Sequence, residues 1–246
     1  MTPRADTIPA LIMEVERGLS RITEEFSPEA NSRKSAFEKR IPKGEEREFA
    51  LKKLLWSLGK RYEHCTLQNY TIYHELQRPI MQRLFDFVPE MPDLLSQSGG
   101  LLLFGHPGTG KDHVLAALLK LAVYGHGLSV EWFDGGSLFD LFHYAAKSEE
   151  SDLKNLNDRL GKPQILAISD PQPPKGSLSD SQVRRIRDVI DRRYRAGLST
   201  WITTNLDTRQ HTESLLTTPL MQRLREGSRQ FEFNWPPYRD RIKPVV

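Results

Sequence analysis

The sequence has almost no cysteine, no long apolar run and little excess charge. Its one cysteine, Cys65, has no second cysteine with which to form an internal disulfide, and the paired cysteines of common zinc sites are missing. No apolar stretch approaches the ~18 residues of a membrane-spanning helix, and Glu14, Glu16 and Arg17 interrupt the apolar residues near the N-terminus. We therefore expect a cytoplasmic protein without a membrane span, a signal peptide or a structural metal.

The net charge of +3 is too small to indicate a nucleic-acid partner by itself. Basic residues do gather in two places, 184–195 and 223–243. The 246 residues, of which 38% are hydrophobic, suffice for one buried core of ~200 residues and a short appendage. We expect one core and one accessory segment.

An amphipathic helix is predicted for residues 8–22. Its polar face carries Glu14, Arg17 and Arg21, and the charged stretch 27–47 that follows, with its prolines and glycine, predicts a linker. The predicted boundary lies near residue 50, giving an N-terminal segment 1–50 and a core 51–246. The apolar face of the helix suits either a partner protein or the chain's own core. That face consists of Ile8, Leu11, Ile12, Val15, Leu19 and Ile22.

From residue 100 onward, short apolar runs alternate with longer helical patterns. This alternation predicts an α/β fold in which a parallel sheet is flanked by helices on both faces. Ser179 and Gln182 have the spacing of a capping box before one of the helices. The predicted strands are 101–104, 129–133, 165–168 and 200–204, and the predicted helices are 114–123, 138–146, 182–194 and a closing helix through Leu224.

A glycine-rich turn between the first strand and its helix predicts a phosphate-binding loop. The glycines Gly105, Gly108 and Gly110 permit backbone angles that direct N–H groups at phosphate oxygens, and Lys111 supplies a positive charge to the β and γ phosphates. The pattern indicates ATP with Mg²⁺ as the cofactor. The predicted loop comprises Gly105, His106, Pro107, Gly108, Thr109, Gly110, Lys111, Asp112 and His113.

One position of the loop departs from the usual pattern. Asp112 stands where a serine or threonine hydroxyl ordinarily binds the magnesium ion. Its carboxylate is a candidate Mg²⁺ ligand, directly or through water, but it also brings negative charge close to the β phosphate. Nucleotide binding is therefore expected more firmly than fast turnover.

The strand 165–168 leads into an incomplete acidic pair. Ser169 occupies the first acidic position and Asp170 the second; if the strand is shifted by one residue, Asp170 becomes the magnesium ligand and Pro171 replaces the acid that activates water. Asp170 would then serve both the metal and the attacking water. We expect slow ATP hydrolysis, with Asp170 as a catalytic and metal-binding residue. A turn residue at the end of the strand is the alternative role.

Asn205 follows the next predicted strand. Because the carboxyl ends of parallel strands face one crevice, Asn205 is a candidate for orienting water or the γ phosphate. An asparagine that caps a turn before Leu206 is the alternative.

Five segments resemble the DnaC-type replicative helicase loaders and their IstB-type relatives, which are AAA+ ATPases. The glycine-rich loop is similar in having histidine two residues after the lysine, and in those families the residue between them is commonly Asn or Asp. The resemblance covers about residues 55–242 and is most specific at the carboxyl end. The remaining segments are Arg61 to Asn69 (RYEHCTLQN), Asp191 to Arg193 (DRR), Leu220 to Ser228 (LMQRLREGS) and Phe233 to Arg239 (FNWPPYR).

The resemblance implies a function as well as an AAA+ core. By it, Arg223 is an arginine finger that enters a neighbouring subunit's nucleotide site, which implies a head-to-tail homo-oligomer. Such loaders assemble around single-stranded DNA and open a ring helicase of the DnaB type, and their N-terminal extension binds that helicase. The 1–50 segment is the corresponding candidate here. The chain departs from the loaders in its acidic pair, which puts hydrolysis in doubt.

Two other functions stay open. A transposition helper ATPase has the same core but serves a transposase, and a nucleotide-binding adaptor would bind ATP with little or no hydrolysis. A transposition helper differs from a loader in its protein partner. A nucleotide-binding adaptor differs from a loader in releasing little or no phosphate. Trp132, Phe133, Phe139 and the basic helix 184–195 are weak candidates for DNA contact, since most such residues lie in cores or on solvated faces.

Overall fold

The computed structural model describes residues 13, 44–171, 178–205, 222, 224 and 226–238. These residues belong to two compact units, of which the first includes 44–96 and 112–130 and the second 97–111 and the described residues from 131 onward. Arg223 and, apart from Met13, the predicted helix 8–22 lie outside the described residues. The predictions that rest on them, including the boundary near residue 50, stay predictions.

The first unit is helical. Its elements are α2 (Gly44–Leu58), the 3-10 helix η3 (Lys60–Tyr62), α3 (Gln77–Ser96), α4 (Lys111–Lys120, of which Lys111 belongs to the second unit) and the π-helix η4 (Leu121–Gly125). Helix α2 buries leucines at positions 51, 54, 55 and 58, the spacing of one helix face, so the last residues of the predicted linker are helical. The sequence prediction lacked α3, which contains Pro89 and Pro92, residues that ordinarily break a helix.

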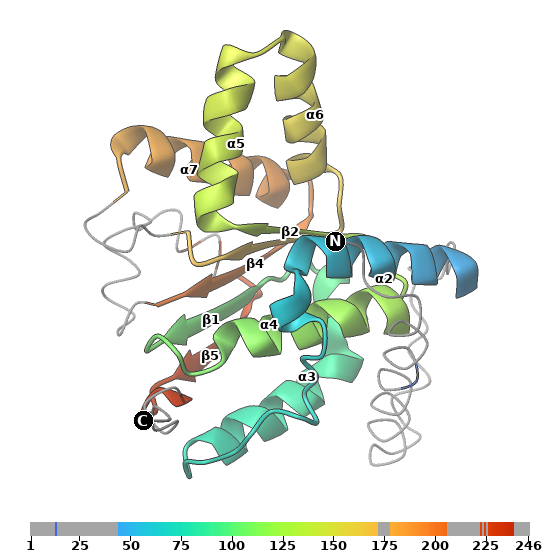
Figure 1. The fold of residues 1–246 in the computed structure, drawn as a ribbon, viewed down its shortest axis with the longest axis vertical. Helices are drawn as coiled ribbons and strands as arrows, with labels where there is room; N and C mark the ends of the chain where they lie inside the picture. The colour runs from blue at the N-terminus through green and yellow to red at the C-terminus, as the bar shows by residue number, and fades with distance from the viewer. Residues whose placement is uncertain are drawn as a thin grey trace. The chain divides into compact units, whose positions relative to one another are not determined.

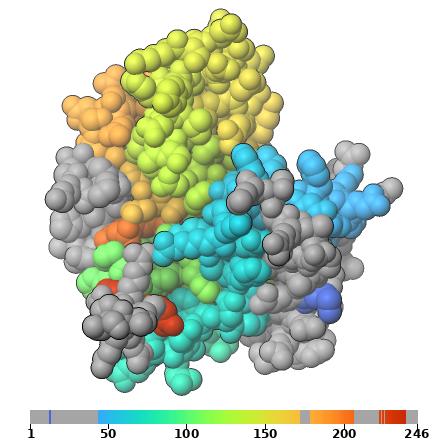
Figure 2. All heavy atoms as spheres, in the orientation of Figure 1, coloured from blue at the N-terminus to red at the C-terminus, as the bar shows by residue number. Residues whose placement is uncertain are grey.

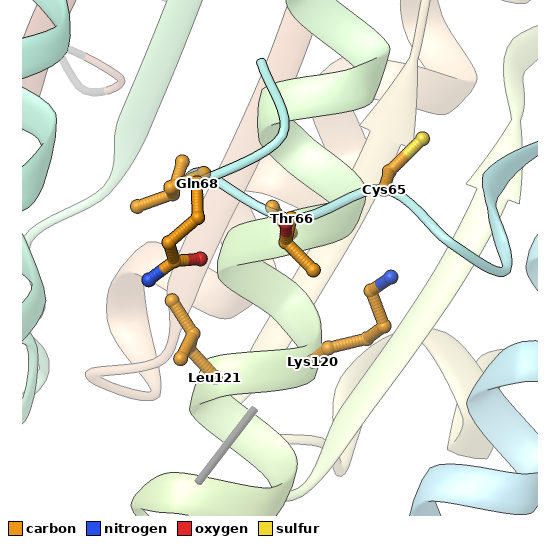
Figure 3. Close-up of a pocket in the computed structure, with 7 residues that line it drawn as sticks. Cys65, Thr66, Gln68, Lys120 and Leu121 are labelled. Atoms are coloured by element: carbon orange, nitrogen blue, oxygen red, sulfur yellow. The ribbon is translucent and has the colours of Figure 1, made fainter. Parts of the chain in front are cut away.

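The segment between η3 and α3 is held against α4 within this unit. Nζ of Lys120 donates to the carbonyl oxygens of Tyr62 (3.2 Å) and Glu63 (2.9 Å). Figure 3 shows residues 65–68 running beside α4, with Lys120 and Leu121 beneath them. The hollow they line has a volume of about 10 Å³, which is room for about one water molecule and no larger ligand.

The second unit contains a five-stranded sheet in the order β2-β3-β4-β1-β5. β1 pairs in parallel with both β4 and β5, and β3 pairs in parallel with β4, with Leu102 opposite Ile202 and Ile202 opposite Ile168. The predicted strands are confirmed to within one or two residues, whereas β5 was missed. The strands are β1 (Leu101–Gly105), β2 (Val130–Asp134), β3 (Ile165–Ser169), β4 (Ser199–Thr204) and β5 (Arg229–Phe233).

Helices α5 (Gly135–Lys147), α6 (Glu150–Gly161) and α7 (Asp180–Arg195) lie on the same side of this sheet (Figure 1). Leu102, Ile202 and Ile168 share a face by register, and they pack in two clusters with apolar residues of these helices. The opposite face is also buried, since Leu101, Leu103 and Trp201 are at most 2% exposed. A helix-flanked parallel sheet, the predicted fold class, is confirmed.

Two local features fix α7. The Ser179 side chain accepts from the Gln182 amide, and the Gln182 side chain accepts from the Ser179 amide, so the predicted capping box is confirmed. At the other end, Arg193 is 1% exposed and donates to the carbonyl oxygens of Leu160 (2.8 Å) and Ser199 (2.5 Å). Burial lowers the pKa of Arg193 to about 10. The arginine therefore ties α7 to α6 and β4 instead of facing solvent.

Candidate nucleotide site

The phosphate loop is a tight turn between β1 and α4. Gly105, Gly108 and Gly110 have φ angles of 129°, 75° and 93°, a region that residues with a Cβ rarely adopt. A Cβ at Gly105 would lie 2.4 Å from the carbonyl oxygen of Phe233 in β5, so a side chain is excluded there by space as well as by conformation. The strand, turn and helix predicted for the motif are present as expected.

Lys111 is held inside this turn. Its side chain is 5% exposed, and Nζ donates to the carbonyl oxygens of Gly105 (2.9 Å) and His106 (2.6 Å). The hydroxyl of Thr109 donates to the same His106 oxygen at 2.7 Å. The carbonyl oxygens of Gly105 and His106 are thus occupied by the loop's own side chains, and the positive charge sits where a phosphate-binding loop requires it. These residues fit a nucleotide phosphate.

The carboxyl-terminal segment after β5 packs on the loop, and this was not predicted. The amide of Tyr238 donates to the Gly108 oxygen at 3.0 Å, and Nε1 of Trp235 donates to the Thr109 oxygen at 3.2 Å. A Cβ at Gly108 would be 3.2 Å from the Pro237 Cβ. The segment therefore fixes carbonyl groups on the outside of the turn. The similarity of this segment to the carboxyl end of the loaders was a signal in the sequence. Such a similarity does not predict which residues the segment contacts.

Asp170 and Asn205 form a hydrogen bond, a contact that was not predicted. They follow the neighbouring strands β3 and β4, and Nδ2 of Asn205 donates to Oδ2 of Asp170. The Asp170 amide donates to Thr203, at 3.0 Å to its carbonyl oxygen and 3.2 Å to its hydroxyl. Because β1 lies beside β4, the phosphate loop, Asn205 and Asp170 follow three adjacent parallel strands and share one edge of the sheet.

The backbone at Asp170 turns sharply. Its φ angle is +46°, the left-handed region that Asp tolerates better than most residues. Gly135, the first residue of α5, makes room for this turn, since a Cβ there would lie 2.3 Å from Cα of Pro171. No motif in the sequence indicates that Gly135 bears on the site. Ser169 is 6% exposed at the end of β3 and accepts a hydrogen bond from Thr203 at 3.3 Å.

Asp112 and His113 belong to the first unit. Nε2 of His113 lies 2.8 Å from the carbonyl oxygen of Thr66, and the imidazole meets the Tyr70 ring edge-on at 5.4 Å between centroids. Burial lowers the pKa of His113, and the charge of Lys120 lowers it further, whereas the contact with Thr66 raises it. His113 therefore acts within the fold of the first unit, holding the segment before α3 to α4.

No group of three or more His, Cys, Asp or Glu side chains able to hold a metal occurs in the part of the chain that the structure describes. A magnesium ion that accompanies a nucleotide needs fewer, because it takes most of its ligands from phosphates and water. The roles of Asp112 and Asp170 as Mg²⁺ ligands stay predictions.

Two of the weak candidates for DNA contact, Phe133 and Phe139, pack in or against the core. Phe133 is 4% exposed and lies under the Arg159 guanidinium, with 4.8 Å between the charge and the ring centroid, and Phe139 packs against both core clusters. Trp132 is half-buried. Within the helix 184–195, Arg193 is buried and donates to backbone carbonyls and to the Thr200 hydroxyl.

The profile of a family described as IstB-like ATP binding protein matches residues 17–244, nearly the whole chain. The chain belongs to this family. The IstB-like family membership agrees with the phosphate loop, with Lys111 inside it and with the Asp170–Asn205 pair, and it makes the chain a nucleotide-binding protein.

Relatives of this IstB-like protein include replicative helicase loaders. It is 27% identical over 187 residues to the replicative helicase loader DnaC of Buchnera aphidicola from Acyrthosiphon pisum, covering 74% of this chain and 72% of the relative. It is also 27% identical to DnaC of Escherichia coli K12, over 74% and 71% of the two chains. A crystal structure of the DnaC helicase loader superposes with a TM-score of 0.61 and 25% identity, covering 72% of this chain and all of that one. The predicted AAA+ core of the DnaC and IstB type is confirmed.

None of the helices in the described ranges is both long and apolar enough to cross a membrane.

Proposed function

We propose that this protein is an ATP-dependent loader that delivers a ring helicase of the DnaB type onto single-stranded DNA during DNA replication. The observation that carries the proposal is the phosphate loop with Lys111 inside it and the carboxyl-terminal segment bonded to its outer side, found in a chain similar to DnaC along 187 residues. Helicase loaders act in DNA replication, so the proposed location is the cytoplasm.

The roles proposed for the site residues follow from their placement. Gly105 to Lys111 bind the phosphates of ATP, and Asp112 and Asp170 are the proposed protein ligands of its Mg²⁺. Asn205 orients Asp170 and the attacking water. With Ser169 in place of an acid, one carboxylate serves both metal and water, and the proposed ATPase is slow.

Assembly completes the proposal. Arg223 is proposed as the finger that enters the nucleotide site of the next subunit, which requires a head-to-tail homo-oligomer. The 1–50 segment, with the apolar face of its predicted helix 8–22, is the proposed binding site for the helicase.

Light scattering on the full chain mixed with a DnaB-type helicase, ATP and Mg²⁺ tests this function. We expect a complex, and we expect Leu11→Glu with Leu19→Glu to abolish it while Glu14→Gln, on the polar face, leaves it intact. A truncated chain used in this experiment should begin at Gly44, so that it keeps the whole of α2. Failure of the unaltered chain to bind any ring helicase would overturn the loader function.

The family match also supports a second candidate, a transposition helper ATPase of the IstB type. A transposase would then replace the helicase in the complex, and the chain would coat double-stranded DNA. An adaptor that binds ATP without releasing phosphate is the third candidate. Its distinguishing result is tight ATP binding without turnover, both with and without DNA.

A further inference from the structure

Two buried hydroxyl groups face each other where β3 and β4 end. Thr203 is 1% exposed and stands by register opposite Ser169, the last residue of β3, which is 6% exposed. The Thr203 hydroxyl donates to the Ser169 hydroxyl at 3.3 Å. The four residues before Ser169 in β3 are apolar and buried, so this polar pair interrupts the core of the sheet at its carboxyl edge. Buried polar groups in such a place are retained through the hydrogen bonds they make.

The Thr203 hydroxyl also reaches the acid that follows β3. The Asp170 amide donates to this hydroxyl at 3.2 Å and to the Thr203 carbonyl oxygen at 3.0 Å. A hydroxyl carries one proton and two lone pairs. Because the proton of Thr203 is directed at Ser169, its lone pairs are left to accept from the Asp170 amide. Ser169 therefore orients the Thr203 hydroxyl, and Thr203 fixes the backbone of Asp170 through two acceptors.

The backbone that Thr203 holds is a strained turn. Asp170 has a φ angle of +46°, a conformation that persists where surrounding contacts fix it. Helix α5 lies at the molecular surface, in yellow-green in Figure 2, but its first residue, Gly135, is buried, and a Cβ there would lie 2.6 Å from the Asp170 carbonyl oxygen. Asn205 in turn donates to the Asp170 carboxylate. Thr203 and Gly135 thus set the backbone of Asp170, and Asn205 sets its side chain.

We infer that Thr203 is a positioning residue for ATP hydrolysis, whose hydroxyl, oriented by Ser169, holds the Asp170 turn and with it the carboxylate at the edge shared with the phosphate loop. Ser169 then has a role of its own at a position where an acid was expected. Catalysis depends steeply on such placement, since a displacement of about 1 Å can cost ~100-fold in rate. The inference rests on the proposed ATPase function, in which Asp170 serves the metal and the attacking water.

The amide resonance of Asp170 tests the geometry without nucleotide. Thr203→Val keeps the shape of the side chain but removes the hydroxyl, whereas Thr203→Ser keeps the hydroxyl. In a full chain labelled with heavy nitrogen at its aspartates, the Asp170 resonance is identified by its loss in Asp170→Asn. We expect Thr203→Val to shift this resonance and to speed hydrogen exchange of the amide about threefold or more. We expect Thr203→Ser to keep the native resonance.

Steady-state phosphate release gives the second readout. We expect Thr203→Val to lower the rate at saturating ATP roughly tenfold and to leave the half-saturating ATP concentration within about twofold, because the phosphate loop is unaltered. Thr203→Ser should restore most of the rate, and Ser169→Ala should fall between Thr203→Val and the native chain. Thr204→Val is the matched control, since Thr204 is 0% exposed in the same strand and projects from the opposite face of the sheet. Circular dichroism reports that each variant is folded.

A native Asp170 resonance in Thr203→Val would overturn the inference, and so would a rate of phosphate release within about twofold of the native rate. An equal loss of rate in Thr204→Val would also overturn it, because any change in the buried end of β4 would then have the same effect. If the native chain binds ATP but releases no phosphate, the proposed ATPase function fails, and the positioning role fails with it. That result is distinct from a native rate that the variants leave unchanged, and helicase binding tests the loader function separately.

Discussion

At the scale of single residues, the chain has the phosphate-binding residues of an ATPase site but only one of the two acids. Lys111 is buried and fixed by two loop carbonyls, whereas the strand that should end in two acids offers Ser169 and Asp170. Asp170 compensates through its position, since its φ of +46° and the Asn205 amide hold its carboxylate in one orientation. We propose that Asp170 decides the rate of turnover, with Asn205 as its positioning residue.

Replacing Asn205 separates binding from turnover. In Asn205→Ala the Asp170 carboxylate loses its amide partner, whereas the phosphate loop is untouched. We expect ATP affinity within about threefold of the native value and a phosphate-release rate lower by roughly tenfold or more. A coupled phosphate assay and titration with a fluorescent ATP analogue measure the two quantities. Equal rates in the variant and the native chain would remove Asn205 from the site.

At the scale of elements, most strands and α7 were predicted, whereas α2, α3, α6 and β5 were missed, although α2 and α3 bury residues at helical spacing. The apolar runs of β1, β3 and β4 and the capped α7 were predicted to within two residues. β5 alternates apolar and exposed residues over five positions only, too few to distinguish it from a loop. Helix α6 has a low apolar content, with Leu156 and Leu160 buried, and α3 has two internal prolines. The loop motif and its glycines needed no tertiary information.

What the sequence could not predict at this scale are contacts between distant segments. Trp235 meets Thr109 across 126 positions, and Gly135 meets Pro171 across 36. Neither contact has a periodic pattern, because each depends on how the strands are ordered in the sheet. The shared edge of Asp170 and Asn205 was predictable, since both residues directly follow parallel strands.

The contact between the carboxyl-terminal segment and the phosphate loop has a direct test. In the native chain the rings of Trp235 and Phe233 lie 4.8 Å apart between centroids. Trp235→Phe keeps an aromatic ring against Phe233 but removes the hydrogen bond to Thr109. Loss of one hydrogen bond costs about 0.5–1.5 kcal/mol, so we expect a lower free energy of unfolding and an ATP affinity reduced roughly threefold or more. Denaturant unfolding and calorimetric ATP titration measure both. A stability loss without any change in ATP affinity would show that the segment does not shape the loop.

We expect the stability of the first unit to depend on pH through two histidines, one in α4 and one directly after η4. Burial lowers the pKa of His113 and of His126 below the ordinary 6.5, so the unfolded chain takes up protons before the folded chain does. Stability is fully present above pH 6.5 and falls as the pH drops through the folded-state values. We expect His113→Gln with His126→Gln to flatten this fall in thermal-unfolding scans between pH 7.5 and 5. An equally steep fall in the double variant would assign the effect to other groups.

At the scale of the whole molecule, family membership and fold agree, and function depends on partners that the single chain does not contain. The IstB-like profile and the DnaC relatives cover the core, where fold and loop are described. The segment proposed to bind helicase and the proposed finger Arg223 act only in an assembly. A sequence predicts such roles through resemblance, because the physical environment of an arginine finger is supplied by another subunit.

The most direct test of the proposed loader function is helicase loading onto a closed circle of single-stranded DNA. A ring helicase cannot encircle such DNA unless the ring is opened. The circle, a DnaB-type helicase, ATP, Mg²⁺ and the full chain are incubated and passed over a sizing column, and helicase bound to the circle is quantified. We expect the native chain to raise bound helicase several-fold over helicase alone, and we expect Lys111→Ala, which lacks the loop's cation, not to do so. Helicase recovery on the circle that is the same with and without the native chain would contradict the proposed loader function.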